Sequence, residues 1–244
     1  MHKTTSADGT TLAYDRVGDG PSVVCVGGAL NNRHSTAPLA KALRDRFTVY
    51  SYDRRGRGDS GDTSPYAVER ELEDLAAIVA ATDGAPRVYG MSSGAILALR
   101  AEASGVPMTR LAVFEPPLPA LAPPAPPRYV ERLTAALTEG RHDEALRLFM
   151  VELVGLPPEL AAGASQTPEL QAIAHTLPYD TAITNAGPVP VHPRVPTLTL
   201  AGSESPQWMR EATHTVAGEH RVLTGQTHDV DPTVLATALA EFFA

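Results

Sequence analysis

Ser92 stands at the centre of residues 90–94, which read Gly-Met-Ser-Ser-Gly, a G-x-S-x-G pattern that could supply a nucleophile. A serine hydroxyl is a weak nucleophile at neutral pH, so it needs a histidine base and a carboxylate that orients this base. Of the eight histidines, we select His228, which stands in a loop before the last predicted helix, 136 residues beyond Ser92 (228 − 92). Such a pair would catalyse acyl transfer through a covalent intermediate.

The sequence around Ser92 predicts a strand, a sharp turn and a helix, which is the context that this pattern requires. The strand is the short run 87–89, and the helix is the alanine-rich run from Ser93 to about Ala103. Glycines on both sides of the serine allow neighbouring backbone to pack closely without a Cβ clash. We therefore expect the Ser92 hydroxyl to stand out at the top of a sheet.

Strand and helix patterns alternate along most of the chain, which predicts a mostly parallel central sheet with helices on both faces. The first two strands should pair antiparallel across the Asp8-Gly9 turn. Strands are predicted at 3–7, 11–17, 22–26, 47–51, 87–89, 110–115, 197–201 and 221–223, and helices of this α/β core at 36–46, 67–81, 93–103, 206–217 and 232–243.

The composition changes after residue 115. Residues 116–127 hold seven prolines in twelve positions, and such a stretch cannot sustain a helix or a central strand. Helical patterns follow at 129–139, 143–154, 158–162 and 169–177, and four prolines between 188 and 196 close the region. We therefore predict an α/β core formed by residues 1–115 and 194–244, with residues 116–193 inserted as a helical cap or lid.

With this organisation the chain resembles the α/β-hydrolase family over nearly its whole length. The resemblance rests on the amino-terminal hairpin, the Gly27-Gly28 loop, the charged loop 53–58, the turn at Ser92, the helical cap and the ending 225–228. It implies the α/β-hydrolase fold, with Ser92 as nucleophile and His228 as base. It also implies an oxyanion hole made by two backbone amides, one from Ser93 and the other from Gly28, with Ala29 as the alternative.

The orienting acid is where this chain departs from the family pattern. The family commonly places it after the strand that follows the cap, where this chain has Ser205, which cannot carry the charge. Glu115 ends the strand after the Ser92 helix, a position at which some members, such as certain haloalkane dehalogenases, keep their acid. We select Glu115, with Glu204 as the alternative acid. Asp180, Asp229 or the absence of any acid are the further alternatives.

The loop 53–60 contains three arginines, two aspartates and two glycines. Such a loop at the carboxyl end of a strand could bind an anion. We favour the other interpretation, in which these arginines and aspartates pair with one another and brace the neighbouring loops.

The cap and the residues beside Ser92 should line the substrate pocket. The candidate substrate-binding residues are Met91, Tyr129, Phe149, Met150, Tyr179, Trp208 and Met209. The favoured function is a serine hydrolase that cleaves a small or medium apolar ester, lactone or thioester through an acyl-enzyme on Ser92. The alternatives are a non-hydrolytic enzyme of the same fold (an acyl transferase, lyase or cyclase of secondary metabolism) and a ligand-binding member with little catalysis.

Composition narrows the partners to a small-molecule substrate. The net charge of −8, without any basic run, argues against nucleic-acid binding. No run of about 18 apolar residues indicates a membrane span, and the first residues lack the apolar core of a signal peptide, so we expect a cytoplasmic protein. Cys25 is the single cysteine, and no metal-binding pattern is present, so we expect neither metal nor cofactor. The sequence leaves open a monomer or a homodimer.

Overall fold

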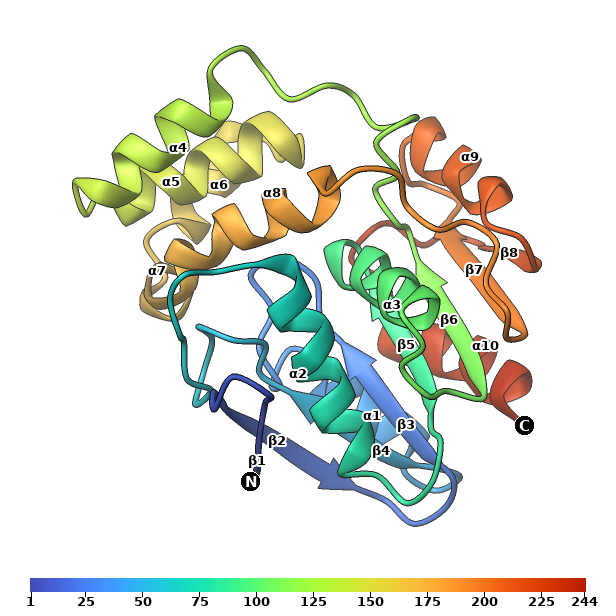
Figure 1. The fold of residues 1–244 in the computed structure, drawn as a ribbon. Helices are drawn as coiled ribbons and strands as arrows, with labels where there is room; N and C mark the ends of the chain where they lie inside the picture. Colours follow the sequence, from blue (N-terminus) through green and yellow to red (C-terminus); the bar gives the residue numbers. More distant parts are fainter.

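Eight strands form one sheet at the centre of the computed structural model, which describes residues 1–244 (Figure 1). Their order across the sheet is β1-β2-β4-β3-β5-β6-β7-β8. The pairs β1–β2 and β2–β4 are antiparallel, and the other five pairs are parallel, which confirms the predicted sheet. The strands are β1 (His2–Thr5), β2 (Thr11–Val17), β3 (Ser22–Val26), β4 (Thr48–Tyr52), β5 (Arg87–Met91), β6 (Arg110–Phe114), β7 (Thr197–Gly202) and β8 (Glu219–Leu223).

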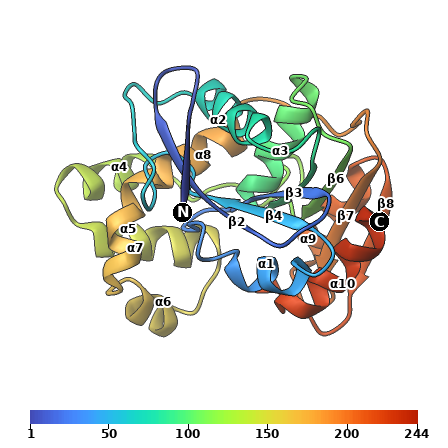
Figure 2. The same ribbon diagram turned by 90° about the horizontal axis from the view of Figure 1, so that it is seen from below.

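Helices cover both faces of the sheet. Helices α1 (Ala37–Leu43) and α10 (Pro232–Phe243) lie on one face, and α2 (Val68–Ala80) and α3 (Ser93–Ala103) lie on the other (Figure 2). Helix α9 (Gln207–Thr215) contributes Ala212 to the same apolar cluster as α2 and α3.

Strand β3 shows why the central strands read as continuous apolar runs. Every residue of β3 is buried. Val24 and Val26 belong to the apolar cluster shared with α2 and α3, whereas Val23 and Cys25 belong to the cluster shared with α1 and α10. Successive side chains of a strand point to opposite faces, so a strand covered on both sides is apolar at every position.

The segment between β6 and β7 contains helices and no strand. Its elements are α4 (Tyr129–Thr138), α5 (His142–Arg147), a π-helix (Leu148–Leu153), α6 (Pro158–Ala164), α7 (Pro168–Ile173), a 3₁₀ turn (Ala174–Thr176) and α8 (Leu177–Asn185). They form an apolar cluster of their own, and Figure 1 shows them grouped above the sheet, on the side toward which β3 and β6 run. We call residues 116–193 the helical segment.

Helix α8 was not anticipated, because the sequence patterns placed the last helix of this region at 169–177. Its first turn contains Pro178, and its apolar side chains are interrupted by threonines and Asp180, which weakens the helical periodicity. No helix of the chain has both the length and the apolar character needed to cross a bilayer.

Candidate active site

Ser92 is the single residue between β5 and α3, and it adopts an unusual backbone conformation with φ 54° and ψ −125°. Its amide donates a hydrogen bond to the Phe114 carbonyl at 2.9 Å. A Cβ added to Gly94 would lie 2.4 Å from the Val26 carbonyl oxygen, and one added to Gly90 would lie 2.6 Å from the Gly94 carbonyl oxygen. Only glycine fits at these two positions, so the sharp turn depends on the two glycines of the G-x-S-x-G pattern.

Glu115 is the carboxylate that contacts His228. It follows β6 and is fully buried, and its Oε2 lies 2.6 Å from Nδ1 of the imidazole. Its Oε1 accepts a hydrogen bond from the amide of Gly202, at the end of β7, at 2.8 Å. His228 lies in the loop that follows β8, with 32% of its side chain exposed. The structure thus brings together the predicted base and the first of the predicted acids.

The other candidate acids lie elsewhere. Glu204 is exposed, and its carboxylate accepts a hydrogen bond from the Ser203 hydroxyl at 3.0 Å. Asp229 is also exposed. Asp180 is buried, but its carboxylate is bound to Ser93 and to arginines. No contact between Glu204 and His228 therefore supports the alternative assignment.

Backbone strain is concentrated around Ser92. Four residues other than glycine have positive φ, and three of them stand in the loops of this site: Leu30 (φ 58°), Ser92 (φ 54°) and Glu115 (φ 46°). Such conformations cost about 1–3 kcal/mol each and persist only where the surroundings enforce them. Strain of this kind clusters at functional sites, so its location independently marks this end of the sheet.

The two predicted oxyanion-hole donors differ in whether their amides are free. The Ser93 amide opens helix α3 and donates to no other group of the chain. The Gly28 amide donates to Oδ1 of Asn31 at 3.0 Å, so it is already occupied. The Ala29 amide has no acceptor within the chain, and Ala29 lines the cavity beside Ser92. These contacts favour the alternative donor, Ala29, over our first choice, Gly28.

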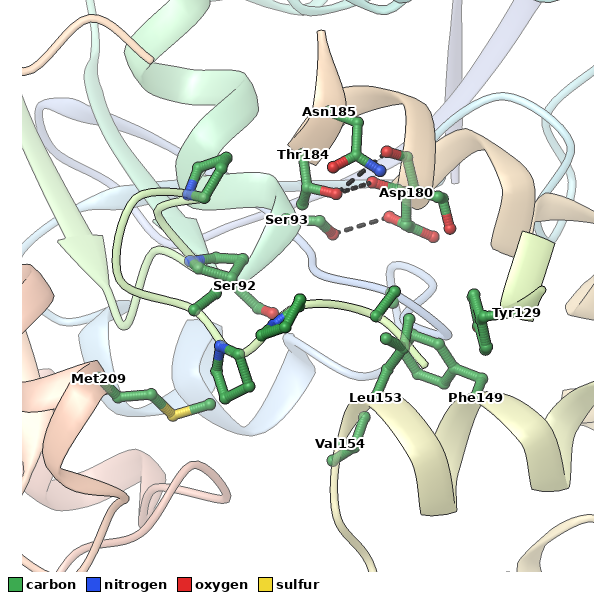
Figure 3. Close-up of a pocket in the computed structure, with 18 of the residues that line it drawn as sticks. Ser92, Ser93, Tyr129, Phe149, Leu153, Val154, Asp180, Thr184, Asn185 and Met209 are labelled. Atoms are coloured by element: carbon green, nitrogen blue, oxygen red, sulfur yellow. Dashed lines mark hydrogen bonds between the residues drawn. The ribbon is translucent and has the colours of Figure 1, made fainter. Parts of the chain in front are cut away.

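A cavity of about 250 Å³ opens at Ser92 and is also lined by His228. The Ser92 hydroxyl does not hydrogen-bond to the imidazole in this conformation, as is common in sites without substrate. Four of the predicted substrate-binding residues line the cavity: Tyr129, Phe149, Trp208 and Met209. Figure 3 shows Tyr129 and Phe149 on the side of the helical segment and Met209 on the opposite side.

Three of the predicted substrate-binding residues do not line the cavity. Met91 packs against the apolar cluster between the sheet and helices α1 and α10. Met150 is 7% exposed and belongs to the apolar core of the helical segment. Tyr179 stacks on the Tyr66 ring, with the centroids 3.9 Å apart, and its hydroxyl donates to Asp62 at 2.7 Å. In each case the side chain is used for packing, which residue type alone does not distinguish from substrate contact.

Two walls of the cavity were missed by the sequence reasoning. One is the proline-rich linker, of which residues 117, 119 and 122–125 line the cavity. The other is helix α8, which presents Asp180, Thr184 and Asn185, labelled in Figure 3, and also Thr181. The prolines themselves were a usable signal, because a segment without free amides can lie against an apolar ligand at no cost in unpaired donors.

The Tyr129 hydroxyl is a polar group without a partner beside this cavity. The residue is 1% exposed, and its hydroxyl contacts no hydrogen-bond acceptor or donor of the chain. Burial raises the pKa of this phenol well above its usual value of 10, so the group stays protonated and remains a hydrogen-bond donor.

The charged loop after β4 forms buried ion pairs, but its arginines pair with carboxylates of other segments and not, as the favoured interpretation had it, with the aspartates of the same loop. Arg54 pairs with Glu71 through two hydrogen bonds of 2.7 Å, and Arg55 pairs with Asp74 in the same way. Arg57 donates to Asp180 at 2.6 Å. Burial opposes the ionised form of Asp180, but Arg57, Arg54 and the Ser93 hydroxyl outweigh it and hold the pKa of this carboxyl below its usual value.

The fold and the site together define a class of protein: a mostly parallel sheet that carries a serine on a sharp strand-to-helix turn and a histidine–glutamate pair beside it. The model of the alpha/beta hydrolase family matches residues 23–240. The chain belongs to the alpha/beta hydrolase family, which makes it a hydrolase without defining its substrate.

Individual relatives agree with this assignment. The chain is 51% identical to an alpha/beta hydrolase from Sphaerobacter thermophilus, with a TM-score of 0.91 and complete coverage of both chains. It shares its fold with a thermophilic esterase from Thermogutta terrifontis at 21% identity and a TM-score of 0.75, over 99% of this chain and 97% of the other. The uncharacterized hydrolase YraK of Bacillus subtilis is 31% identical over 100 residues, which are 39% of this chain and only 37% of YraK.

Proposed function

We propose that this protein is a cofactor-free serine hydrolase that cleaves small or medium carboxylic esters, lactones or thioesters through an acyl-enzyme on Ser92. The observation that carries the proposal is the buried Glu115 carboxylate, 2.6 Å from Nδ1 of a histidine that lines the same cavity as Ser92. A carboxylate on Nδ1 fixes the tautomer that leaves Nε2 free to accept a proton.

The proposed reaction proceeds in two halves. In the first, Oγ of Ser92 attacks the substrate carbonyl carbon, and His228 accepts its proton at Nε2. The amides of Ser93 and Ala29 donate to the oxyanion, which collapses as the alcohol or thiol leaves with the proton from His228. In the second, His228 deprotonates a water molecule that attacks the acyl-enzyme, and the carboxylic acid product leaves with Ser92 restored.

The cavity also suggests which acyl groups fit. Its volume of about 250 Å³ and its apolar walls suit a short or medium acyl chain. Tyr129 and Phe149 line the wall formed by the helical segment and add aromatic surface beside an acyl chain. The Tyr129 hydroxyl itself is buried and is not accessible from the cavity.

Active-site labelling combined with turnover tests the proposal. The wild-type protein should react stoichiometrically with a fluorophosphonate probe and hydrolyse p-nitrophenyl esters of short and medium acyl chains, and the Ser92→Ala variant should do neither. Labelling without turnover of any ester or thioester would instead favour a non-hydrolytic enzyme of this fold. Absence of labelling would favour a ligand-binding protein, and either result overturns the proposal.

A further inference from the structure

The guanidinium of Arg57 holds the backbone of the loop that contains Ala29. Arg57 is 1% exposed, and its Nη1 donates to the carbonyl oxygens of Gly28 at 2.6 Å and of Asn31 at 3.2 Å. Its Nη2 donates to Oδ2 of Asp180 at 2.6 Å. Arg57 is absent from the cavity lining, so it acts on the site only through these partners.

The Gly28 carbonyl and the Ala29 amide belong to the same peptide group. In a planar trans peptide the C=O and the N–H point in opposite directions. Because Arg57 holds the carbonyl on its own side, the amide of Ala29 is directed to the opposite side, where Ala29 lines the cavity beside Ser92. A side chain 28 residues away (57 − 29) therefore helps to hold the orientation of the proposed oxyanion donor, together with the Asn31 amide, which donates to the same carbonyl at 3.3 Å.

This loop needs such a restraint. Leu30 has a φ of 58°, a left-handed conformation that a bulky side chain rarely adopts. The surroundings must therefore hold the loop in a conformation that it would not keep alone. Two further contacts hold the loop. The Gly28 amide donates to the Asn31 side chain, and Nη1 of Arg54 lies 3.3 Å from the Gly27 carbonyl oxygen.

Asp180 connects Arg57 to the second oxyanion donor. Its Oδ2 accepts from Arg57, and its Oδ1 accepts from the Ser93 hydroxyl at 2.7 Å and from Arg54 at 2.8 Å. Figure 3 shows the Ser93 contact reaching across from α3 to α8. One carboxylate of the helical segment is thus bound to both sides of the oxyanion hole, directly to Ser93 and through Arg57 to the Gly28–Ala29 peptide.

We propose that Arg57 and Asp180 are positioning residues for the oxyanion hole, and that they connect it to helix α8. The inference rests on the proposed hydrolase function. It assigns to α8 an effect on the transition state, in addition to its place in the cavity wall. Arg57 lies outside the cavity lining, so its loss should weaken transition-state stabilisation and leave substrate binding nearly intact.

The same loop offers a matched control. Arg55 is also buried, and it pairs with Asp74 through two hydrogen bonds of 2.7 Å, but its remaining partners are Asp8 and the Arg70 carbonyl. None of these groups belongs to the loop 27–31 or lines the cavity. Arg55→Lys therefore disturbs a buried ion pair of the same kind without reaching the oxyanion hole.

The experiment compares Arg57→Lys, Arg55→Lys and Ser93→Ala with the wild type. For each, kcat and KM are measured on a p-nitrophenyl ester, together with the inhibition constant of a simple boronic acid, which forms a tetrahedral adduct with serine, and the melting temperature. Lysine keeps the charge of Arg57, but a single ammonium group cannot reproduce the forked contacts to the carbonyls and to Asp180.

Arg57→Lys should lower kcat by about 10²-fold, the effect of losing one oxyanion donor, and should weaken boronic acid inhibition while KM changes by less than about threefold. Ser93→Ala should lower kcat by only about tenfold, because the backbone amide remains. It should also lower the melting temperature by a few degrees, because Asp180 loses a buried hydrogen bond. Arg55→Lys should lower the melting temperature and leave kcat and boronic acid inhibition within about twofold of the wild type.

Equal effects of Arg57→Lys and Arg55→Lys on kcat, or a loss in Arg57→Lys that appears in KM alone, would overturn the positioning role while the hydrolase function stands. Absence of ester hydrolysis in the wild type would instead remove the proposed function, and the positioning role with it.

Discussion

The Glu115 carboxylate is held between two partners, with Oε2 2.6 Å from His228 Nδ1 and Oε1 2.8 Å from the Gly202 amide. The Glu115 amide also donates to the Leu200 carbonyl at 2.9 Å, so β7 holds this residue through its backbone as well as its side chain. With no exposed surface and a strained φ of 46°, Glu115 has little freedom to turn away from the imidazole. The acid thus follows β6, and the neighbouring strand fixes its orientation.

Glu115→Gln should retain the fold and lower kcat by about 10²–10⁴-fold, because the amide cannot stabilise the imidazolium formed during acyl transfer. Glu204→Gln is the control, since Glu204 is exposed and lies outside the cavity lining. Steady-state kinetics on one p-nitrophenyl ester would measure both variants. Equal activity of Glu115→Gln and the wild type would remove Glu115 from the catalytic group.

The sequence patterns predicted the sheet and the sharp turn at Ser92, because both follow from local rules. Alternating strands and helices require a parallel sheet, and the paired glycines around Ser92 have one steric use. Glu115 could be proposed from its place at a strand end. The choice between Glu115 and Glu204 depended on which loop approaches His228, and this is a tertiary property that neither residue type nor spacing determines.

The contacts of Asp180 could not be predicted, for a related reason. Its partners Ser93 and Arg57 lie 87 and 123 residues away in the chain, and α8 itself shows weak periodicity. A buried aspartate is recognisable only once the arginines that neutralise it are placed around it. The sequence could not show which of the adjacent amides of Gly28 and Ala29 is free, because this depends on the Asn31 side chain, which accepts from the Gly28 amide.

Gly94→Ala should disrupt the turn at Ser92. The added Cβ would lie 2.4 Å from the Val26 carbonyl oxygen, so backbone must move, at a cost of about 1–3 kcal/mol in stability. The displaced serine should lose about 10²-fold or more in kcat. Gly163→Ala is the matched control, because Gly163 lies in α6 with open space around its Cβ position, and alanine there should raise stability by up to about 1 kcal/mol. Urea unfolding and ester turnover measure both effects, and a fully active Gly94→Ala protein would contradict the steric argument.

Tyr129→Phe should not weaken the fold. Removing a buried hydroxyl without a partner should leave the stability unchanged or raise it by about 1 kcal/mol. Tyr179→Phe is the control, since its hydroxyl donates to Asp62, and loss of this hydrogen bond should lower the stability by about 0.5–1.5 kcal/mol. Urea unfolding measures both variants, and a loss of stability in Tyr129→Phe as large as in Tyr179→Phe would contradict a hydroxyl without a partner.

Cys25 should be unreactive while the protein is folded. It is 1% exposed within β3, and burial raises the pKa of its thiol to about 12, so the reactive thiolate is scarce at neutral pH. A maleimide should label the native protein at a negligible rate and the protein in urea at once. Rapid labelling of the native protein would show that β3 opens far more readily than a central strand should.

Asp180→Asn should destabilise the protein in a pH-dependent way. Because Arg57 and Arg54 outweigh burial and depress the folded-state pKa of Asp180, its ionised form stabilises the fold fully above the ordinary aspartate pKa of about 3.9. This stabilisation is lost as the pH falls through the lower folded-state value. At pH 6 the variant leaves buried arginine charge uncompensated and should be about 3–5 kcal/mol less stable than the wild type. The difference should shrink steadily below about pH 4, as Asp180 becomes protonated in the wild type. Urea unfolding at pH 6 and pH 3 would measure it, with the exposed Glu204→Gln as the control. A difference of the same size at both pH values would contradict the depressed pKa.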